Sequence, residues 1–295
     1  MIVRVLGSAA GGGVPQWNCA CVHCSAARSG TRPRRSQSGF AFSSDGDRWW
    51  LLNASPDIAQ QIEAYAPLQP RDSRGTPIAG MLFTDANVDH LGGLAVLRQA
   101  GAHAFELHSS ATVRALAADQ PAFATFTAPP HRWSALAPGD VVDLSCGLSA
   151  RVVALDGLTP GFAGRQSLPD AVVGYLVSDA ATGGSVFFAP VFADVSATLL
   201  EAAAKADVAF FDGSFWSDDE LQGFGVEKAA RALGHAPVGG LHGSLAALAT
   251  LRPKARRLYV HVNNTNPLLD PASAPAREIA AYGFELASDG LDLRV

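Results

Sequence analysis

The sequence is poor in charge and has no long hydrophobic run. Only 17% of its 295 residues are Asp, Glu, Lys or Arg, the formal net charge is −5, and the longest basic tract is the short segment 32–35. This balance argues against nucleic acid or an anionic membrane surface as a partner. No apolar run reaches the ~18–20 residues of a membrane helix, and the first seven residues are too short for a signal-peptide core. We therefore expect a cytoplasmic protein without a membrane span.

Cysteine is also scarce, with four residues in the chain. A hydrophobic content of 48% is enough for a large core, which excludes a disordered chain and a small disulfide scaffold. The 29 glycines and 18 prolines are dispersed, so no linker divides the sequence. We expect a single domain over residues 1–295.

Three of the four cysteines lie within six residues. Cys19, Cys21 and Cys24 form a C-x-C-x-x-C run on a predicted loop at about 15–26. Three thiolates so close can converge on one tetrahedral ion, and zinc is the usual occupant of such a site. The spacing predicts a structural zinc, and a disulfide is the weaker alternative in a cytosolic protein. The fourth ligand is not evident; His235 or a residue near His261 is favoured over His23.

The hydrophobic pattern predicts strands that alternate with helices and also form tight hairpins. Strands are expected at 1–7, 78–83, 151–155, 171–178, 185–189, 208–211 and 257–262, and hairpins at 40–44 with 49–54 and at 284–287 with 291–295. Helices are expected at 91–100, 194–205 and 243–251, and a short one is expected to begin with Ser55 as N-cap and Pro56 in its first turn. The mixture favours one or two mixed sheets with helices outside.

A polar loop at 84–90 follows the strand at 78–83, at a strand end where α/β sites usually lie. It resembles the H-x-H-x-D-H motif of the metallo-β-lactamase superfamily. Asp85 and Asn87 stand at the first two histidine positions, whereas Asp89 and His90 match the motif. The resemblance implies an αββα sandwich of two mixed sheets flanked by helices.

The same resemblance extends to the second half of the chain. His261 lies near a strand end, where the superfamily places its last metal ligand, and His235 matches a helix-start histidine of phosphodiesterase members. No histidine occurs between positions 155 and 173 for the third motif, and Ala189 and Pro190 stand where the metal-bridging aspartate is expected. A dinuclear hydrolase therefore lacks several of its ligands here.

The superfamily ligands that persist are Asp89, His90 and His261. Two imidazoles and one carboxylate match the facial triad of non-haem Fe(II) oxygenases, although another divalent metal can occupy such a set. Asp85, Asp212, His235 and Asn263 are expected near the site as substrate contacts. Asp212 is equally suited to ligate the metal or to orient a histidine, and Asp85 to cap the loop.

Longer segments resemble a narrower family. Residues 5–13 with 15–19, then 53–58 and 261–267, are similar to the PqqB family of pyrroloquinoline quinone (PQQ) biosynthesis proteins. The resemblance implies either an iron-dependent oxygenase that hydroxylates the tyrosine of a Glu-Tyr-derived precursor or a non-catalytic carrier that takes part in transport of PQQ or its precursor to the periplasm. A metal-dependent hydrolase or phosphodiesterase is a weaker alternative. The expected partners are that small precursor or PQQ and other proteins of the pathway.

Overall fold

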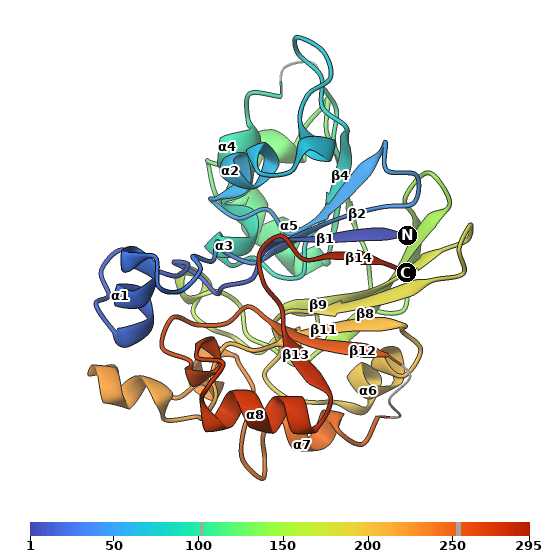
Figure 1. Cartoon of the computed structure of the whole chain (residues 1–295). Coiled ribbons are helices and arrows are strands. Elements are labelled where there is room, and N and C mark those ends of the chain that lie inside the picture. Colours follow the sequence, from blue (N-terminus) through green and yellow to red (C-terminus); the bar gives the residue numbers. More distant parts are fainter. Residues whose placement is uncertain (101–102, 252–254) are drawn as a thin grey trace.

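Two seven-stranded sheets pack face to face, and helices cover the outer face of each (Figure 1). The computed structural model describes residues 1–100, 103–251 and 255–295. The first sheet has the order β14-β1-β2-β3-β4-β5-β6 and the second the order β13-β12-β11-β10-β9-β8-β7. Both sheets contain parallel and antiparallel pairs, so the expected αββα sandwich of mixed sheets is confirmed.

The strands of the first sheet are β1 (Ile2–Gly7), β2 (Gly39–Ser43), β3 (Trp49–Leu52), β4 (Ile78–Leu82), β5 (Glu106–Ser109), β6 (Arg132–Ala135) and β14 (Asp292–Arg294). Those of the second sheet are β7 (Val141–Asp143), β8 (Leu148–Leu155), β9 (Val172–Asp179), β10 (Ser185–Ala189), β11 (Val208–Asp212), β12 (Arg256–Val260) and β13 (Phe284–Leu286).

The first predicted hairpin is confirmed, and the second is wrong. Strands β2 and β3 pair antiparallel around the turn that contains Asp45 and Gly46. By contrast, β13 pairs with β12 and β14 pairs with β1, so the last two strands belong to different sheets. Asp289 fixes the segment that connects β13 to β14, because its carboxylate accepts hydrogen bonds from the hydroxyl of Ser8 and from the backbone N–H of Ser36.

An aromatic core joins the two sheets. Phe40 lies 4.9 Å from Phe188 and 4.7 Å from Phe210 between ring centroids, and all three rings are fully buried. Full burial of one such side chain contributes about 1.5–3 kcal/mol to folding. The core therefore fixes how β2 of the first sheet sits on β10 and β11 of the second.

The helices are short and amphipathic. They are α1 (Val22–Ser29), α2 (Ile58–Glu63), α3 (Val88–Leu91), α4 (Gly93–Leu97), α5 (Ala111–Ala118), α6 (Ala197–Ala203), α7 (Ser244–Leu248) and α8 (Ala274–Ala281). Buried residues of α2, α3, α4 and α5 pack on the first sheet, and those of α6, α7 and α8 pack on the second. None of the helices in the described residues is long and apolar enough to cross a membrane.

Two predicted helix starts are wrong. The helix expected at Ser55 begins at Ile58, because the Ser55 hydroxyl accepts the N–H of Asp57 in a turn that precedes the helix. The helix expected at 91–100 begins at Val88 and is interrupted at Gly92. A side chain at Gly92 would approach the Val88 carbonyl oxygen to 2.5 Å, so close packing explains the glycine.

Candidate active site

Asp89, His90 and His261 converge where the two sheets meet. Asp89 and His90 lie on α3, just after β4, whereas His261 directly follows β12. One ligand atom from each lies within 4.8 Å of the other two, and Asp89 Oδ2 is 3.1 Å from His261 Nε2. The predicted trio is thus brought together from two sheets.

The His90 ring is held from behind by Asp85. Asp85 Oδ2 lies 2.6 Å from His90 Nδ1, and both side chains are fully buried. The other oxygen, Oδ1, accepts hydrogen bonds from the backbone N–H and the side-chain amide of Asn87. His90 Nε2 is buried without a hydrogen-bond partner among the described residues. This is the arrangement of a metal-binding histidine oriented by a carboxylate, and it places Asp85 behind the ring.

Carboxylates dominate the electrostatics around His90. Burial by itself lowers the pKa of His90, but Asp85 and Asp89 outweigh it and raise the pKa to about 9. Burial raises the pKa of the two carboxyl groups, yet the neighbouring imidazoles hold the pKa of both below the usual range. The cluster therefore favours a positive charge at the position that the ligand atoms surround.

His261 is fixed by Ser214, a residue that the sequence did not suggest. His261 has a left-handed backbone with φ 59°, which is unusual for a residue with a side chain. Ser214 Oγ lies 2.8 Å from His261 Nδ1 and 2.6 Å from Asp212 Oδ1. Because the hydroxyl donates its one hydrogen to the carboxylate, it accepts from Nδ1–H. The other ring nitrogen, Nε2, faces Asp89.

Asp212 and His235 extend this network. His235 Nδ1 lies 2.7 Å from Asp212 Oδ2, and a ligand atom from each lies within 4.8 Å of one from His261. Asp212 is fully buried, and both of its oxygens already accept hydrogen bonds, from Ser214 on one side and from His235 and the Phe192 N–H on the other. A carboxylate so occupied is suited to orient histidines, which is one of the three roles considered for Asp212.

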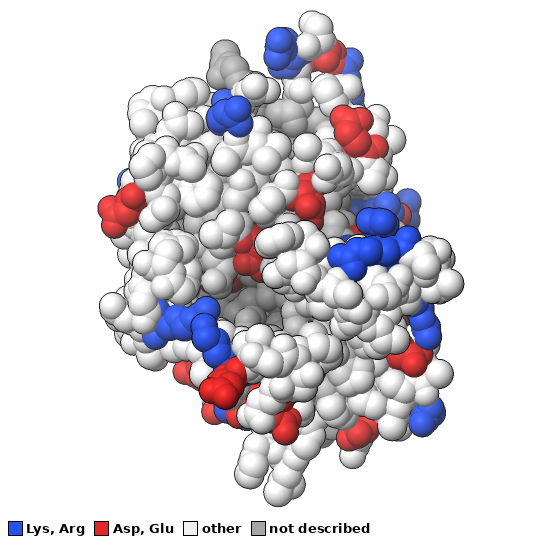
Figure 2. All heavy atoms as spheres, turned by 90° about the vertical axis from the view of Figure 1, so that its left-hand side faces the viewer, with Lys and Arg blue, Asp and Glu red and all other residues white. Residues whose placement is uncertain are grey.

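The glycine-rich N-terminal loop lies beside Asp89, and a chain of polar side chains begins two residues after His261. A Cβ on Gly11 would lie 3.2 Å from Asp89 Oδ2, so the absent side chain leaves room for this carboxylate. Asn263 donates to Thr265 Oγ1 at 2.6 Å, and Thr265 in turn donates to Glu220. Figure 2 shows the face on this side of the molecule, which is hollowed near its centre, with acidic side chains beside the hollow.

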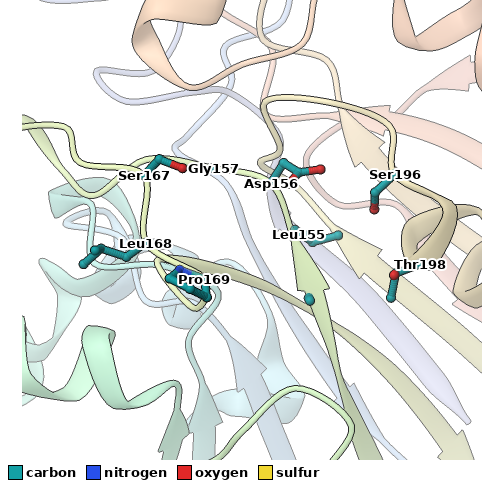
Figure 3. Close-up of a pocket in the computed structure, with 9 residues that line it drawn as sticks. Leu155, Asp156, Gly157, Ser167, Leu168, Pro169, Ser196 and Thr198 are labelled. Carbon is teal, nitrogen blue, oxygen red and sulfur yellow. The ribbon is translucent and has the colours of Figure 1, made fainter.

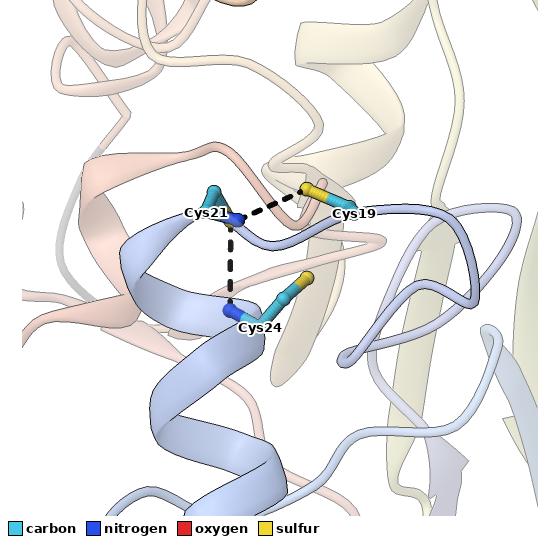
Figure 4. A group of neighbouring side chains, drawn as sticks. All are labelled: Cys19, Cys21 and Cys24. Carbon is cyan, nitrogen blue, oxygen red and sulfur yellow. Dashed lines mark hydrogen bonds between the residues drawn. The ribbon is translucent and has the colours of Figure 1, made fainter.

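The three cysteines form a second cluster (Figure 4). Cys21 is the N-cap of α1 and Cys24 lies in its first turn, so the cluster spans a loop and a helix. Cys19 Sγ accepts the N–H of Cys21, and Cys21 Sγ accepts the N–H of Cys24. The three sulfurs lie within 4.8 Å of one another. This is compatible with the ~3.8 Å sulfur separation around a tetrahedral zinc.

The candidate fourth ligands lie in different places. His235 belongs to the Asp212 network rather than to the cysteine cluster. Asn264, three residues after His261, contacts Cys21 and Cys24.

A separate hollow of about 290 Å³ lies between the segment after β8 and the start of α6 (Figure 3). Asp156, Ser167 and Ser196 line it, and none of them belongs to the groups that could hold a metal.

Comparisons with known proteins agree with this geometry. A model of the β-lactamase superfamily domain matches residues 48–262. The coenzyme PQQ synthesis protein B of Rhizobium meliloti (strain 1021) is 41% identical over 99% of this chain and 97% of its own. The chain belongs to the coenzyme PQQ synthesis protein B family. Family membership assigns it a function in PQQ biosynthesis.

Solved structures support the same family. The Zn²⁺-bound crystal structure of PqqB from Methylobacterium extorquens is 36% identical, covers both chains completely and has a TM-score of 0.93. A diphosphatase of the PhnP family covers 99% of this chain and 96% of its own with a TM-score of 0.70, but it is 19% identical and shares the fold alone.

Proposed function

We propose that this PQQ synthesis protein is an Fe(II)-dependent oxygenase that hydroxylates the tyrosine ring of a Glu-Tyr-derived precursor, with Asp89, His90 and His261 as iron ligands. The observation that carries the proposal is the convergence of these three donor atoms within 4.8 Å, together with a buried His90 Nε2 that has no partner in the described chain. A buried polar atom without a partner is costly unless something binds it.

The donor set suits this metal and this chemistry. Two imidazoles and one carboxylate leave coordination positions for O₂ and substrate, as in non-haem Fe(II) oxygenases. When bound, Fe(II) supplies the activation of O₂. The reaction inserts one oxygen atom into an aromatic C–H bond of the tyrosine and so adds a second hydroxyl group to its ring. The second oxygen atom leaves as water, with two electrons and two protons from an external reductant.

The surrounding residues hold the ligands and the substrate. Asp85 and Ser214 contact Nδ1 of His90 and of His261, which leaves Nε2 of each ring to bind the ion. We further propose Asn263 and His235 as contacts for a carboxylate or amine of the precursor.

We also propose that Cys19, Cys21 and Cys24 hold a structural Zn²⁺. The zinc-bound relative from Methylobacterium extorquens supports a zinc site in the family. In this chain the three clustered sulfurs supply the soft donors that zinc prefers.

The test is anaerobic reconstitution with Fe(II), a count of the metals per chain, and then addition of Glu-Tyr dipeptide, a reductant and O₂. We expect a product heavier by one oxygen atom, detected by mass spectrometry and absent with His90→Ala and His261→Ala. Asp57→Asn is a matched control, because this carboxylate binds Gln37 rather than the histidines. Bound iron without a product from this dipeptide or a longer precursor contradicts the oxygenase.

Two other functions predict different outcomes. A carrier binds PQQ or its precursor without turnover, and His90→Ala and His261→Ala then leave PQQ formation in cells intact. A hydrolase requires a second metal, for which Asp212, His235 and His261 are the candidate ligands. One non-thiolate metal per chain would exclude it.

A further inference from the structure

Asn53 and Thr84 meet behind the Asp85–His90 pair. Asn53 directly follows β3, Thr84 lies two residues after β4, and both side chains are buried. Asn53 Nδ2 donates to Thr84 Oγ1 at 2.9 Å, and the Thr84 backbone N–H donates to Asn53 Oδ1 at 3.0 Å. Because the amide both donates to and accepts from the same residue, its orientation is fixed.

The amide in turn orients the Thr84 hydroxyl, which has one hydrogen to donate. Its oxygen accepts from Asn53 Nδ2, so the hydrogen points to another partner. Asp85 Oδ2 lies 2.8 Å away and is the nearest acceptor, whereas Asn53 Oδ1 lies at 3.2 Å. The hydroxyl therefore donates to Asp85, and a hydrogen bond to a charged acceptor is a strong one.

This bond completes the set of donors around the Asp85 carboxylate. Oδ1 accepts two hydrogen bonds from Asn87, and Oδ2 accepts one each from Thr84 and His90. An ionised carboxylate has about four acceptor positions, so all of them are in use. Because such a group can only accept, His90 Nδ1 carries the hydrogen of its 2.6 Å bond to Asp85, and Nε2 is the ring nitrogen left for a metal.

The end of β3 also holds the backbone of His90. The N–H of Ala54 donates to the His90 carbonyl at 2.7 Å, and the Ala54 carbonyl accepts the N–H of Gly93 at 2.8 Å. The chain reaches these contacts through a left-handed turn at Asn53, with φ 59°, a conformation that asparagine adopts more readily than most residues. Side chain and backbone of His90 are thus both held from the same strand end.

We propose that Asn53 and Thr84 are positioning residues for His90. The inference rests on the proposed function, in which His90 Nε2 binds Fe(II). The Asn53 amide orients the Thr84 hydroxyl, the hydroxyl completes the hydrogen bonds of Asp85, and Asp85 fixes the His90 ring. Both residues act through Asp85.

The first measurement is Fe(II) affinity by anaerobic calorimetry. Thr84→Val removes the hydroxyl and keeps the shape of the side chain, so we expect binding about tenfold weaker, the equivalent of one hydrogen bond to a charged group. Thr84→Ser keeps the hydroxyl and should stay within about twofold of the wild type. Wild-type affinity in Thr84→Val, or equally weak binding in Thr84→Ser, overturns the proposal.

Thr112→Val is the matched control. Its hydroxyl also donates to a carboxylate, at 2.6 Å, but that carboxylate belongs to Asp170 and not to Asp85. We expect wild-type affinity for this variant. A loss equal to that of Thr84→Val would show a general effect of removing a threonine hydroxyl and contradict the proposal.

Asn53→Gly separates the amide from the turn. Glycine keeps the left-handed backbone and removes the side chain. We expect binding about fivefold weaker, the equivalent of one neutral hydrogen bond. The loss should be smaller in the Thr84→Val background, because the hydroxyl through which the amide acts is already absent. An equal loss in both backgrounds, or no loss in the wild type, contradicts the role of Asn53.

The second measurement is proton NMR of the iron-free protein with ¹⁵N-labelled histidine. The short bond to Asp85 should give the His90 Nδ1–H a low-field signal. We expect this signal to shift in Thr84→Val and Asn53→Gly and to stay in place in Thr84→Ser and Thr112→Val. A merely structural role lowers the temperature of thermal unfolding without moving the signal, and that result overturns the proposal.

The proposed function fails in a distinguishable way. Absence of bound Fe(II) or of a hydroxylated product refutes the oxygenase, whereas the NMR signal of the iron-free protein tests the contacts of Asn53 and Thr84 without the metal. If Thr84→Val does not fold, Asn53→Gly decides the question, because an unchanged signal together with wild-type affinity in that variant refutes the positioning role.

Discussion

Replacing Asp85 with asparagine should harm the metal site more than replacing it with alanine. In the wild type, Asp85 Oδ1 accepts two hydrogen bonds from Asn87, at 2.9 and 2.8 Å, and Oδ2 accepts from His90 Nδ1–H. An asparagine that keeps both bonds to Asn87 must turn its NH₂ group toward His90. His90 Nδ1 then has to accept, and its proton moves to Nε2, where the metal should bind.

The magnitude follows from these contacts. Loss of an orienting carboxylate typically weakens metal affinity by about 10–100-fold, which is our expectation for Asp85→Ala. To bind metal, Asp85→Asn must also rotate its amide and break the two hydrogen bonds to Asn87. At about 1 kcal/mol each, this adds roughly 2 kcal/mol, or about 30-fold. The expected order of affinity is wild type, then Asp85→Ala, then Asp85→Asn.

The assay is anaerobic Fe(II) titration by calorimetry at fixed pH. Thermal unfolding of the metal-free variants checks that each is folded, and Asp57→Asn controls for the loss of one negative charge. Equal or tighter binding by Asp85→Asn than by Asp85→Ala would refute the proposed tautomer of His90.

Four further outcomes are expected. Ser214→Ala removes the acceptor that fixes His261 Nδ1–H, so Fe(II) affinity in the same titration should fall about 10–100-fold. Asp85 and Asp89 raise the pKa of His90 to about 9 although burial lowers it, and a metal must displace the proton that His90 holds. The apparent affinity for Fe(II) should therefore rise about tenfold per pH unit up to about pH 9 and then level off. Burial raises the pKa of Glu220 to about 7, above its ordinary 4.5, so the native state binds this proton more tightly than the unfolded state does. The free energy of unfolding of the wild type should therefore fall by about 3 kcal/mol between about pH 4.5 and 8. Chemical denaturation measures this loss, which should be absent in Glu220→Gln. Cys21→Ser should lower zinc content and cost on the order of several kcal/mol of stability, and unchanged zinc by mass spectrometry would contradict the thiolate site.

Local pattern was sufficient for most of the fold. The strand expected at 185–189 is β10 with the same bounds, because a short apolar run between polar turns specifies a buried strand. The strands at 284–287 and 291–295 looked like a hairpin for the same local reason. Their separation into two sheets depends on the contacts of Asp289 with Ser8 and Ser36, more than 250 positions away, which no local pattern contains.

Some residues of the candidate site could likewise be predicted from the sequence, and others could not. Cys19, Cys21 and Cys24 could be predicted to cluster because their spacing is local, and Asp89, His90 and His261 because a family motif relates them. Ser214 escaped notice, and Asn264 was covered only by the general expectation of a residue near His261. Serine and asparagine are common residues, and Ser214 gains its role only when folding brings it to His261, 47 positions away.

The proposed metal-ligand trio belongs to neither sheet alone. Asp89 and His261 are 172 positions apart, and the aromatic contacts of Phe40 with Phe188 and Phe210 help to set how the two sheets lie on each other. Interiors packed at crystal-like density transmit small shifts rather than absorb them. Substitutions among these aromatic rings, none of them a ligand, should therefore change which divalent ion the protein selects. On this view the hydrophobic core, and not the ligands alone, sets the metal preference that we expect for this protein.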